Sequence, residues 1–209
     1  EERSIDKTLN SILKTNYPKD KIEIIVVDDG SIDNTFSIAK EFEGKMIKVF
    51  KKEINGGKGS ALNFGIRKSS GEIIFTMDAD TTVHQESLKK MVIYFKNPEV
   101  MSVTPAIITH KPINIIQRIQ YIEYLTGLFL RKTFAALNAI HITPGAFSAY
   151  RKSFFETYGG YDENNITEDL EMALRIQFNK YKIENAESAM VSTNPPKDFF
   201  HLLKQRRRW

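Results

Sequence analysis

The chain has 209 residues, of which 41% are hydrophobic and 27% are charged, and its formal net charge is +4. This length is enough for one well-packed domain. The absence of cysteine excludes disulfides and thiolate zinc sites, and the net positive charge is too small to indicate nucleic-acid binding by itself.

Helix and strand patterns alternate over the first half of the chain. In chain order we expect a helix at 4–14, a strand at 22–27, a helix at 34–43, a strand at 46–50, a helix at 58–68, a strand at 72–77, a helix at 85–97 and a strand at 100–104. This alternation predicts an α/β fold with a doubly wound, mostly parallel sheet flanked by helices.

After Pro112 the pattern becomes mainly helical. We expect helices at 113–140, 152–158, 167–180 and 198–209, with loop-like stretches at 144–151 and 158–162 whose aromatic residues suit either sugar rings or ordinary packing. Charged residues interrupt the 113–140 stretch, so it is too polar to span a membrane. We expect this amphipathic helix to pack in the core, and a helix lying on a membrane surface is the alternative.

Two predicted strands end in acidic pairs. Asp28 and Asp29 follow the strand at 22–27, and Asp78 and Asp80 follow the strand at 72–77. Ligands of open α/β sheets bind at the carboxyl ends of the strands, and two carboxylates can hold a divalent cation that also binds phosphates. The alternative is that these residues only start turns or cap helices. Together the two pairs indicate one shared acidic crevice.

A glycine-rich loop, Asn55-Gly56-Gly57-Lys58-Gly59-Ser60, lies between a predicted strand and a predicted helix. Its backbone amides and Lys58 are suited to a phosphate. Gly59 stands where a Walker A loop needs Ser or Thr, so the loop is not of that type. A turn with a solvated lysine is the alternative.

Two further motifs begin and end predicted helices. Thr167-Glu168-Asp169 has a good N-cap residue and favourable first-turn acids, and the functional alternative is a general base at the helix start. Gln205-Arg206-Arg207-Arg208-Trp209 ends the chain. Its arginines are either a solvated or basic surface, or a grip on a diphosphate.

Together these motifs resemble the family 2 glycosyltransferases, specifically the processive, membrane-embedded polysaccharide synthases. The motifs that carry the resemblance, in the order typical of that family, are Asp28-Asp29-Gly30-Ser31, Asn55-Gly56-Gly57-Lys58-Gly59, Asp78-Ala79-Asp80, Thr167-Glu168-Asp169 and Gln205-Arg206-Arg207-Arg208-Trp209. The closing Gln-x-x-Arg-Trp is the most specific element. The lysine loop with Ser60-Ala61-Leu62-Asn63 looks most like bacterial poly-N-acetylglucosamine synthases, which are related to cellulose and hyaluronan synthases.

The resemblance implies a GT-A-type fold and an inverting, metal-dependent transfer of a sugar, N-acetylglucosamine or glucose. The donor would be a UDP-sugar and the acceptor the end of a growing β-linked polysaccharide. The implied catalytic residues are Asp169, as the base, and Glu168. The implied nucleotide-sugar-binding residues are Asp28, Asp29, Lys58, Asp78, Asp80, Gln205, Arg208 and Trp209. Asp80 and Asp78 would hold Mg²⁺ or Mn²⁺.

The resemblance also implies a single glycosyltransferase domain over 1–209, with a nucleotide-sugar-binding half at 1–110 and an acceptor-binding half at 111–209. We expect this domain to be part of a longer membrane protein, whose other segments contact the membrane, and to lie at the cytoplasmic face of the cell membrane. No nucleic-acid partner is expected. The alternatives are a non-processive transferase acting on a lipid or single acceptor, a glycoside hydrolase using Asp80 and Asp169, and a non-catalytic, membrane-apposed binding module.

Overall fold

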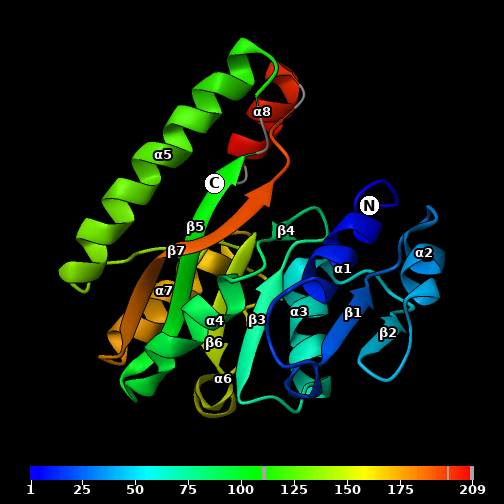
Figure 1. Cartoon of the computed structure of the whole chain (residues 1–209), viewed down its shortest axis with the longest axis horizontal. Coiled ribbons are helices and arrows are strands. Elements are labelled where there is room, and N and C mark those ends of the chain that lie inside the picture. The colour runs from blue at the N-terminus through cyan, green and yellow to red at the C-terminus, as the bar shows by residue number, and fades with distance from the viewer. Residues whose placement is uncertain (110–111, 197, 208–209) are drawn as a thin grey trace.

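The computed structural model describes residues 1–109, 112–196 and 198–207, and it contains two sheets (Figure 1). A two-stranded parallel sheet is formed by β1 (Ile24–Asp28) and β2 (Ile47–Lys51). The larger sheet has the strand order β3-β6-β5-β7-β4. Its strands are β3 (Ile73–Met77), β4 (Thr82–Val83), β5 (Val100–Thr109), β6 (Phe147–Arg151) and β7 (Lys182–Thr193).

The helices fall close to the predicted positions. They are α1 (Ile5–Leu13), α2 (Thr35–Glu41), α3 (Gly57–Lys68), α4 (Ser87–Val92), α5 (Ile115–Ala136), α6 (Lys152–Tyr158), α7 (Glu168–Phe178) and α8 (Phe199–Arg206). The helix predicted at 85–97 is shorter, because α4 passes into a 3₁₀ turn at Ile93–Lys96. A second 3₁₀ turn, Lys19–Lys21, precedes β1.

The core lies on both faces of the larger sheet. Ile73 and Phe75 of β3 pack with the cluster that contains the α4 side chains, whereas Ile74 packs with the cluster of α6 and α7. Successive side chains of a strand point to opposite faces, which is why one strand serves both clusters. A third cluster joins α1 and α2 to the small sheet. The predicted α/β class with flanking helices is therefore confirmed.

The strand directions differ from the prediction, because the larger sheet is mixed rather than mostly parallel. β5 and β7 pair in parallel, but β3 with β6, β5 with β6 and β4 with β7 pair antiparallel. Neither β6 nor β7 was predicted from the sequence. The segment that forms β6 was predicted as part of a loop. The β7 sequence contains lysine, glutamates and asparagine with no clear alternation. Its conformation comes from pairing with β5, and such context decides strand formation more than local propensity does.

Chain segments on either side of residue 110 share the larger sheet, because β6 and β7 pair with β3, β4 and β5. The C-terminal part is thus less helical than predicted. Whether 1–110 and 111–209 divide donor and acceptor binding stays a prediction. Among the described residues, no helix combines the length and apolar character needed to cross a bilayer.

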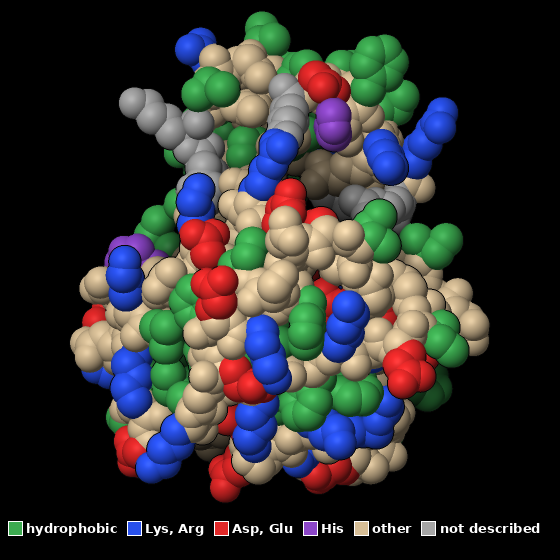
Figure 2. All heavy atoms as spheres, turned by 90° about the vertical axis from the view of Figure 1, so that its right-hand side faces the viewer, with side chains coloured by type: hydrophobic (Ala, Val, Ile, Leu, Met, Phe, Trp, Pro, Cys, Tyr) green, Lys and Arg blue, Asp and Glu red, His purple; other side chains and the backbone are tan. Residues whose placement is uncertain are grey.

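The prediction that the 113–140 helix packs in the core is wrong. α5 stands at the edge of the molecule with α8 beside one end (Figure 1), and within α5 the buried residues are Gln117 and Gln120. Several large apolar side chains of α5 and α8 are more than half exposed: Ile115, Ile119, Ile122, Phe129, Phe199 and Phe200. Figure 2 shows hydrophobic side chains on the upper part of the molecule, where these helices lie.

Candidate active site

The carboxylate at the end of β1 is partly used by the chain itself. Asp28 is 5% exposed, and its Oδ1 accepts hydrogen bonds from the backbone N–H groups of Gly30 at 3.1 Å and Ser31 at 3.0 Å. Asp28 therefore starts a turn, as the structural alternative predicted. Its Oδ2 is buried and has no hydrogen-bond partner among the described residues. A buried acceptor without a partner is costly, so this oxygen is suited to a ligand's donor group.

Asp29 connects the end of β1 to the glycine-rich loop. Lys52 Nζ lies 2.5 Å from Asp29 Oδ1 and 2.9 Å from Ser60 Oγ. The backbone N–H of Gly57 donates to Asp29 Oδ2 at 2.7 Å, and that of Gly56 donates to both carboxylate oxygens. Asp29 thus fixes the loop at the start of α3. Lys52 was not predicted, since a lysine after β2 has no feature in the sequence that separates it from a solvated one.

Lys58 joins the predicted motifs at one point. Its Nζ lies 2.6 Å from Asp78 Oδ1 and 3.5 Å from Glu168 Oε1. Burial lowers the pKa of Lys58, but Asp78, Glu168 and Asp169 raise it, and the net shift is upward. The glycine loop, the end of β3 and the start of α7 therefore meet at this ammonium group.

Gly145 is a second residue that the sequence did not single out. A Cβ atom at this position would overlap the Lys58 ammonium group and would lie 3.7 Å from Glu168 Oε1. A larger residue here would require the Lys58 ammonium group to shift from its contacts with Asp78 and Glu168. Its place after Pro144, in a segment predicted as a loop, was the sole signal.

The two carboxylates after β3 are suited to a cation. Burial, and next the charge of Asp78, together raise the pKa of Asp80 to about 6. A cation would relieve this repulsion between like charges. The described residues contain no group of three or more His, Cys, Asp or Glu that could hold a metal. Two carboxylates are nevertheless a usual protein share for a cation that is also bound by substrate phosphates.

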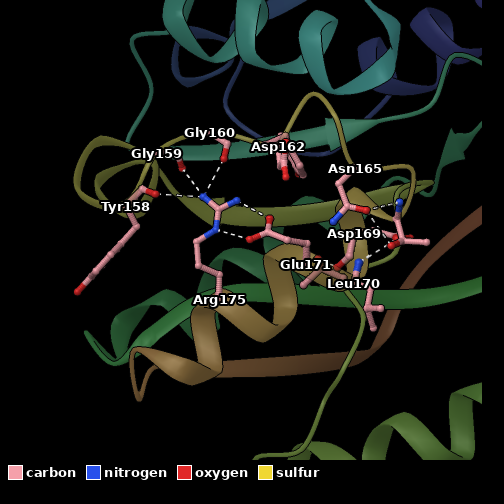
Figure 3. Close-up of polar contacts among 12 residues, drawn as sticks. Tyr158, Gly159, Gly160, Asp162, Asn165, Asp169, Leu170, Glu171 and Arg175 are labelled. Carbon is pink, nitrogen blue, oxygen red and sulfur yellow. Dashed lines mark hydrogen bonds and ion pairs between the residues drawn. The ribbon is translucent and has the colours of Figure 1, made fainter.

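The start of α7 brings Glu168 and Asp169 to the site. Thr167 is the N-cap residue, but its hydroxyl oxygen accepts no hydrogen bond from the backbone N–H groups of α7, so the predicted capping bond is absent. The hydroxyl donates instead to Asn165 Oδ1 at 3.0 Å. Asp169 Oδ1 accepts a hydrogen bond from Leu170 N at 2.9 Å (Figure 3). Asp169 Oδ2 has no partner among the described residues, so it can accept a proton.

The C-terminal motif is attached to α5. Gln205 Oε1 accepts a hydrogen bond from Gln120 Nε2 at 2.9 Å, and Arg206 forms an ion pair with Glu123. Arg208 and Trp209, which we predicted to bind the diphosphate and the acceptor, lie outside the described residues.

Tyr124 of α5 interacts electrostatically with Arg206 of α8 and with Asp80 of the acidic pair. Burial raises the pKa of Tyr124, Arg206 and Arg131 lower it, and Asp80 and Glu123 raise it further, with an upward net shift. The charges of both Arg206 and Asp80 therefore influence the pKa of Tyr124. Tyr124 was not predicted from the sequence, because an aromatic residue in an apolar helix usually indicates core packing.

A model of the family described as Glycosyl transferase family 2 matches residues 1–159. The chain belongs to glycosyl transferase family 2. Among curated members, the poly-beta-1,6-N-acetyl-D-glucosamine synthase of Staphylococcus epidermidis is 33% identical over 212 residues, which are 100% of this chain and 51% of the relative. The synthase of the same name from Staphylococcus aureus strain COL is 33% identical over 213 residues, again 100% and 51%. The chain spans about half the length of these relatives.

Solved glycosyltransferases have the same fold. The mannosyltransferase PcManGT from Pyrobaculum calidifontis, in complex with GDP-Man and Mn²⁺, matches with a TM-score of 0.82 at 25% identity, covering 99% of this chain and 57% of that one. S. aureus TarS 1-349 in complex with UDP-GlcNAc matches with a TM-score of 0.70 at 19% identity, covering 96% and 57%. The predicted GT-A-type fold and the glycosyltransferase class are confirmed.

Proposed function

We propose that this glycosyltransferase moves N-acetylglucosamine or glucose from a UDP-sugar to the end of a growing β-linked polysaccharide, with inversion and with a divalent cation. The contact of Lys58 with both Asp78 and Glu168 carries the proposal, since it joins the acidic pair after β3 to the acids that begin α7. The names of the staphylococcal relatives support N-acetylglucosamine, and TarS bound to UDP-GlcNAc supports a UDP-sugar.

Asp80 and Asp78 would hold Mg²⁺ or Mn²⁺. Bound there, the cation would stabilise the charge that develops on the diphosphate leaving group. The mutual repulsion of the two carboxylates and the Mn²⁺ of the structurally similar mannosyltransferase support this assignment. Lys58 supplies a further positive charge beside Asp78 and is kept protonated by its acidic neighbours.

The remaining steps depend on the chain's own residues. Asp169 Oδ2 accepts the proton of the attacking hydroxyl, and Glu168 holds Lys58 in place. Asp28 Oδ2, buried and without a partner among the described residues, accepts from the nucleoside, with Asp29 beside it. Gln205, Arg208 and Trp209 are proposed to contact the diphosphate and the acceptor. A single displacement by the hydroxyl inverts the anomeric centre, so an α-linked donor yields a β-linkage.

The membrane is the proposed partner of the whole protein, through segments outside this chain, at the cytoplasmic face. The exposed apolar side chains of α5 and α8 support this arrangement. Transfer to a lipid or single acceptor is the second candidate. The described residues that we assign to the donor and to the base do not distinguish one acceptor from another.

The test uses the full-length protein with UDP-GlcNAc or UDP-glucose, in Mn²⁺ or in EDTA, and measures released UDP and linked sugar. We expect UDP release and a β-linked product in Mn²⁺ alone. Equal turnover in EDTA would overturn the metal role, and cleavage of glycosides without any nucleotide would favour the hydrolase. Binding of UDP with no turnover of either sugar would favour the non-catalytic module.

A further inference from the structure

The loop at residues 158–163, between α6 and α7, is held on one side by α3. Asn63 of α3 is 8% exposed. Its Nδ2 donates to Tyr161 O at 2.9 Å, and its Oδ1 accepts from Tyr161 N at 2.8 Å. A Cβ atom at Gly160 would overlap Asn63 Oδ1. The side-chain amide of Asn63 thus pairs with both backbone polar groups of Tyr161, as the backbone of a neighbouring strand would.

Arg175 of α7 holds the same loop from the other side. Its Nη1 donates to three successive carbonyl oxygens, those of Tyr158 and Gly159 at 3.1 Å each and of Gly160 at 2.8 Å. Its other nitrogens bind the Glu171 carboxylate, with Nε 2.7 Å from Oε1. Figure 3 shows the guanidinium group between Glu171 and the loop carbonyls. A lysine could not reproduce this fork of donors.

The two helices that grip the loop are the helices that begin at the active site. Lys58 is in the first turn of α3, and Asp169 is in the first turn of α7. Asn63 and Arg175 lie five and six residues further along, which is roughly 7–9 Å of helix. A helix moves as a rigid rod over that length, so a shift of the loop would change the separation of Lys58 and Asp169, which the direct Lys58–Glu168 contact also limits.

We propose that Asn63 and Arg175 are positioning residues for sugar transfer. By clasping the 158–163 loop from α3 and α7, they fix the base Asp169 relative to the donor-binding Lys58 and Asp78. This inference rests on the function proposed above. A displacement of about 1 Å in such a geometry can cost about 10²-fold in rate. Lys58 and Asp78 contact each other directly, so the loss falls mainly on kcat and leaves the KM for the donor nearly unchanged.

The test compares Arg175→Lys with Arg151→Lys in the full-length protein. Arg151 is a matched control because it also donates to backbone carbonyl oxygens, those of Phe95 at 2.8 Å and Asn97 at 3.2 Å, but these do not belong to α3 or α7. We expect both variants to lose thermal stability. We expect kcat to fall at least about 10-fold for Arg175→Lys alone, with the donor KM within about twofold.

A second variant, Asn63→Asp, keeps the size of the side chain and replaces the Nδ2 donor by a carboxylate oxygen that faces Tyr161 O and Glu163 Oε1. It weakens the α3 clasp and covers the case in which Arg175→Lys does not fold. Its kcat should fall in the same way, and combining the two changes should cost less than the product of the single losses, since both act through one loop. Equal kcat values for Arg175→Lys and Arg151→Lys, or an unchanged kcat for Asn63→Asp, would overturn this inference alone. No transfer by the unmodified protein would overturn the proposed function and this inference with it.

Discussion

The acidic ends of β1 and β3 look alike in the sequence and differ in their partners. At the end of β1, Asp28 and Asp29 accept hydrogen bonds from backbone amides, and Asp29 also pairs with Lys52. At the end of β3, Asp78 has Lys58 for a partner, while Asp80 has its pKa raised to about 6 by burial and by the charge of Asp78. The first pair mainly stabilises the local backbone through these contacts. In the second pair, the Asp80 carboxylate can bind a positively charged ligand.

The largest effect should appear at Asp169, across Lys58 from the end of β3. Asp169→Asn keeps the shape and removes the proton acceptor, so transfer should fall by ~10²-fold or more, the usual contribution of a general base. Donor affinity should stay within about twofold. UDP-sugar binding and product yield in the full-length protein measure this. A yield near that of the unmodified protein would leave Asp169 with only its favourable place in the first turn of a helix.

The next effect concerns the acidic pair that we assign to a cation. Asp80→Asn should weaken UDP binding in Mn²⁺ by about 10-fold or more and should change it little in EDTA, because a diphosphate needs the cation to lie beside a carboxylate. Calorimetric titration under the two conditions measures the difference. If the unmodified protein binds UDP equally well in EDTA, the assignment of a cation to the carboxylates at the end of β3 is wrong.

Asp29→Asn should act on stability instead. It leaves Lys52, whose side chain is 15% exposed, without its charged partner, and we expect a loss of about 1–3 kcal/mol in the free energy of unfolding. Glu43→Gln is the control, since it breaks a Lys40 pair whose side chains are 48% and 39% exposed, and it should therefore cost less stability than Asp29→Asn. Unchanged stability with lost UDP affinity would place Asp29 beside Asp80 as a ligand-binding residue.

The sequence predicted those site residues whose motifs stand at element ends. The end of β3, the start of α3 and the start of α7 meet at Lys58. Whether the end of β1 shares one acidic crevice with them stays a prediction. The sequence did not predict Lys52, Gly145 or Tyr124, because each depends on a neighbour distant in the chain. No local pattern distinguishes such a residue from a solvated lysine, a turn glycine or a core aromatic.

The fold was predictable to a similar extent. Apolar runs such as Ile73–Met77 specify a strand by themselves, and α6 lies where it was predicted. In contrast, β7 depends on its ladder with β5, which shifts register at Pro105, where a proline cannot donate to the ladder. The apolar stripe of α5 predicted burial, and that prediction was wrong, because Ile119, Ile122 and Leu125 are exposed in the described structure.

The smallest expected effect is on thermal stability, which should change in opposite directions when Asp80 at the end of β3 or Asp29 at the end of β1 is replaced by Asn. An acid whose folded pKa lies above its unfolded value binds more protons in the folded state, so stability falls as pH rises through that window. For Asp80 the window runs from 3.8 to about 6. Asp80→Asn should therefore raise the free energy of unfolding at pH 7.5 in EDTA by about 1 kcal/mol, after allowance for partial exposure. The melting temperature should rise with it at pH 7.5 and stay nearly unchanged at pH 3. Asp29→Asn should lower it at pH 7.5. Thermal melts of both variants at the two pH values measure the contrast, and a lower melting temperature for Asp80→Asn at pH 7.5 would mean that Asp80, like Asp29, stabilises the fold.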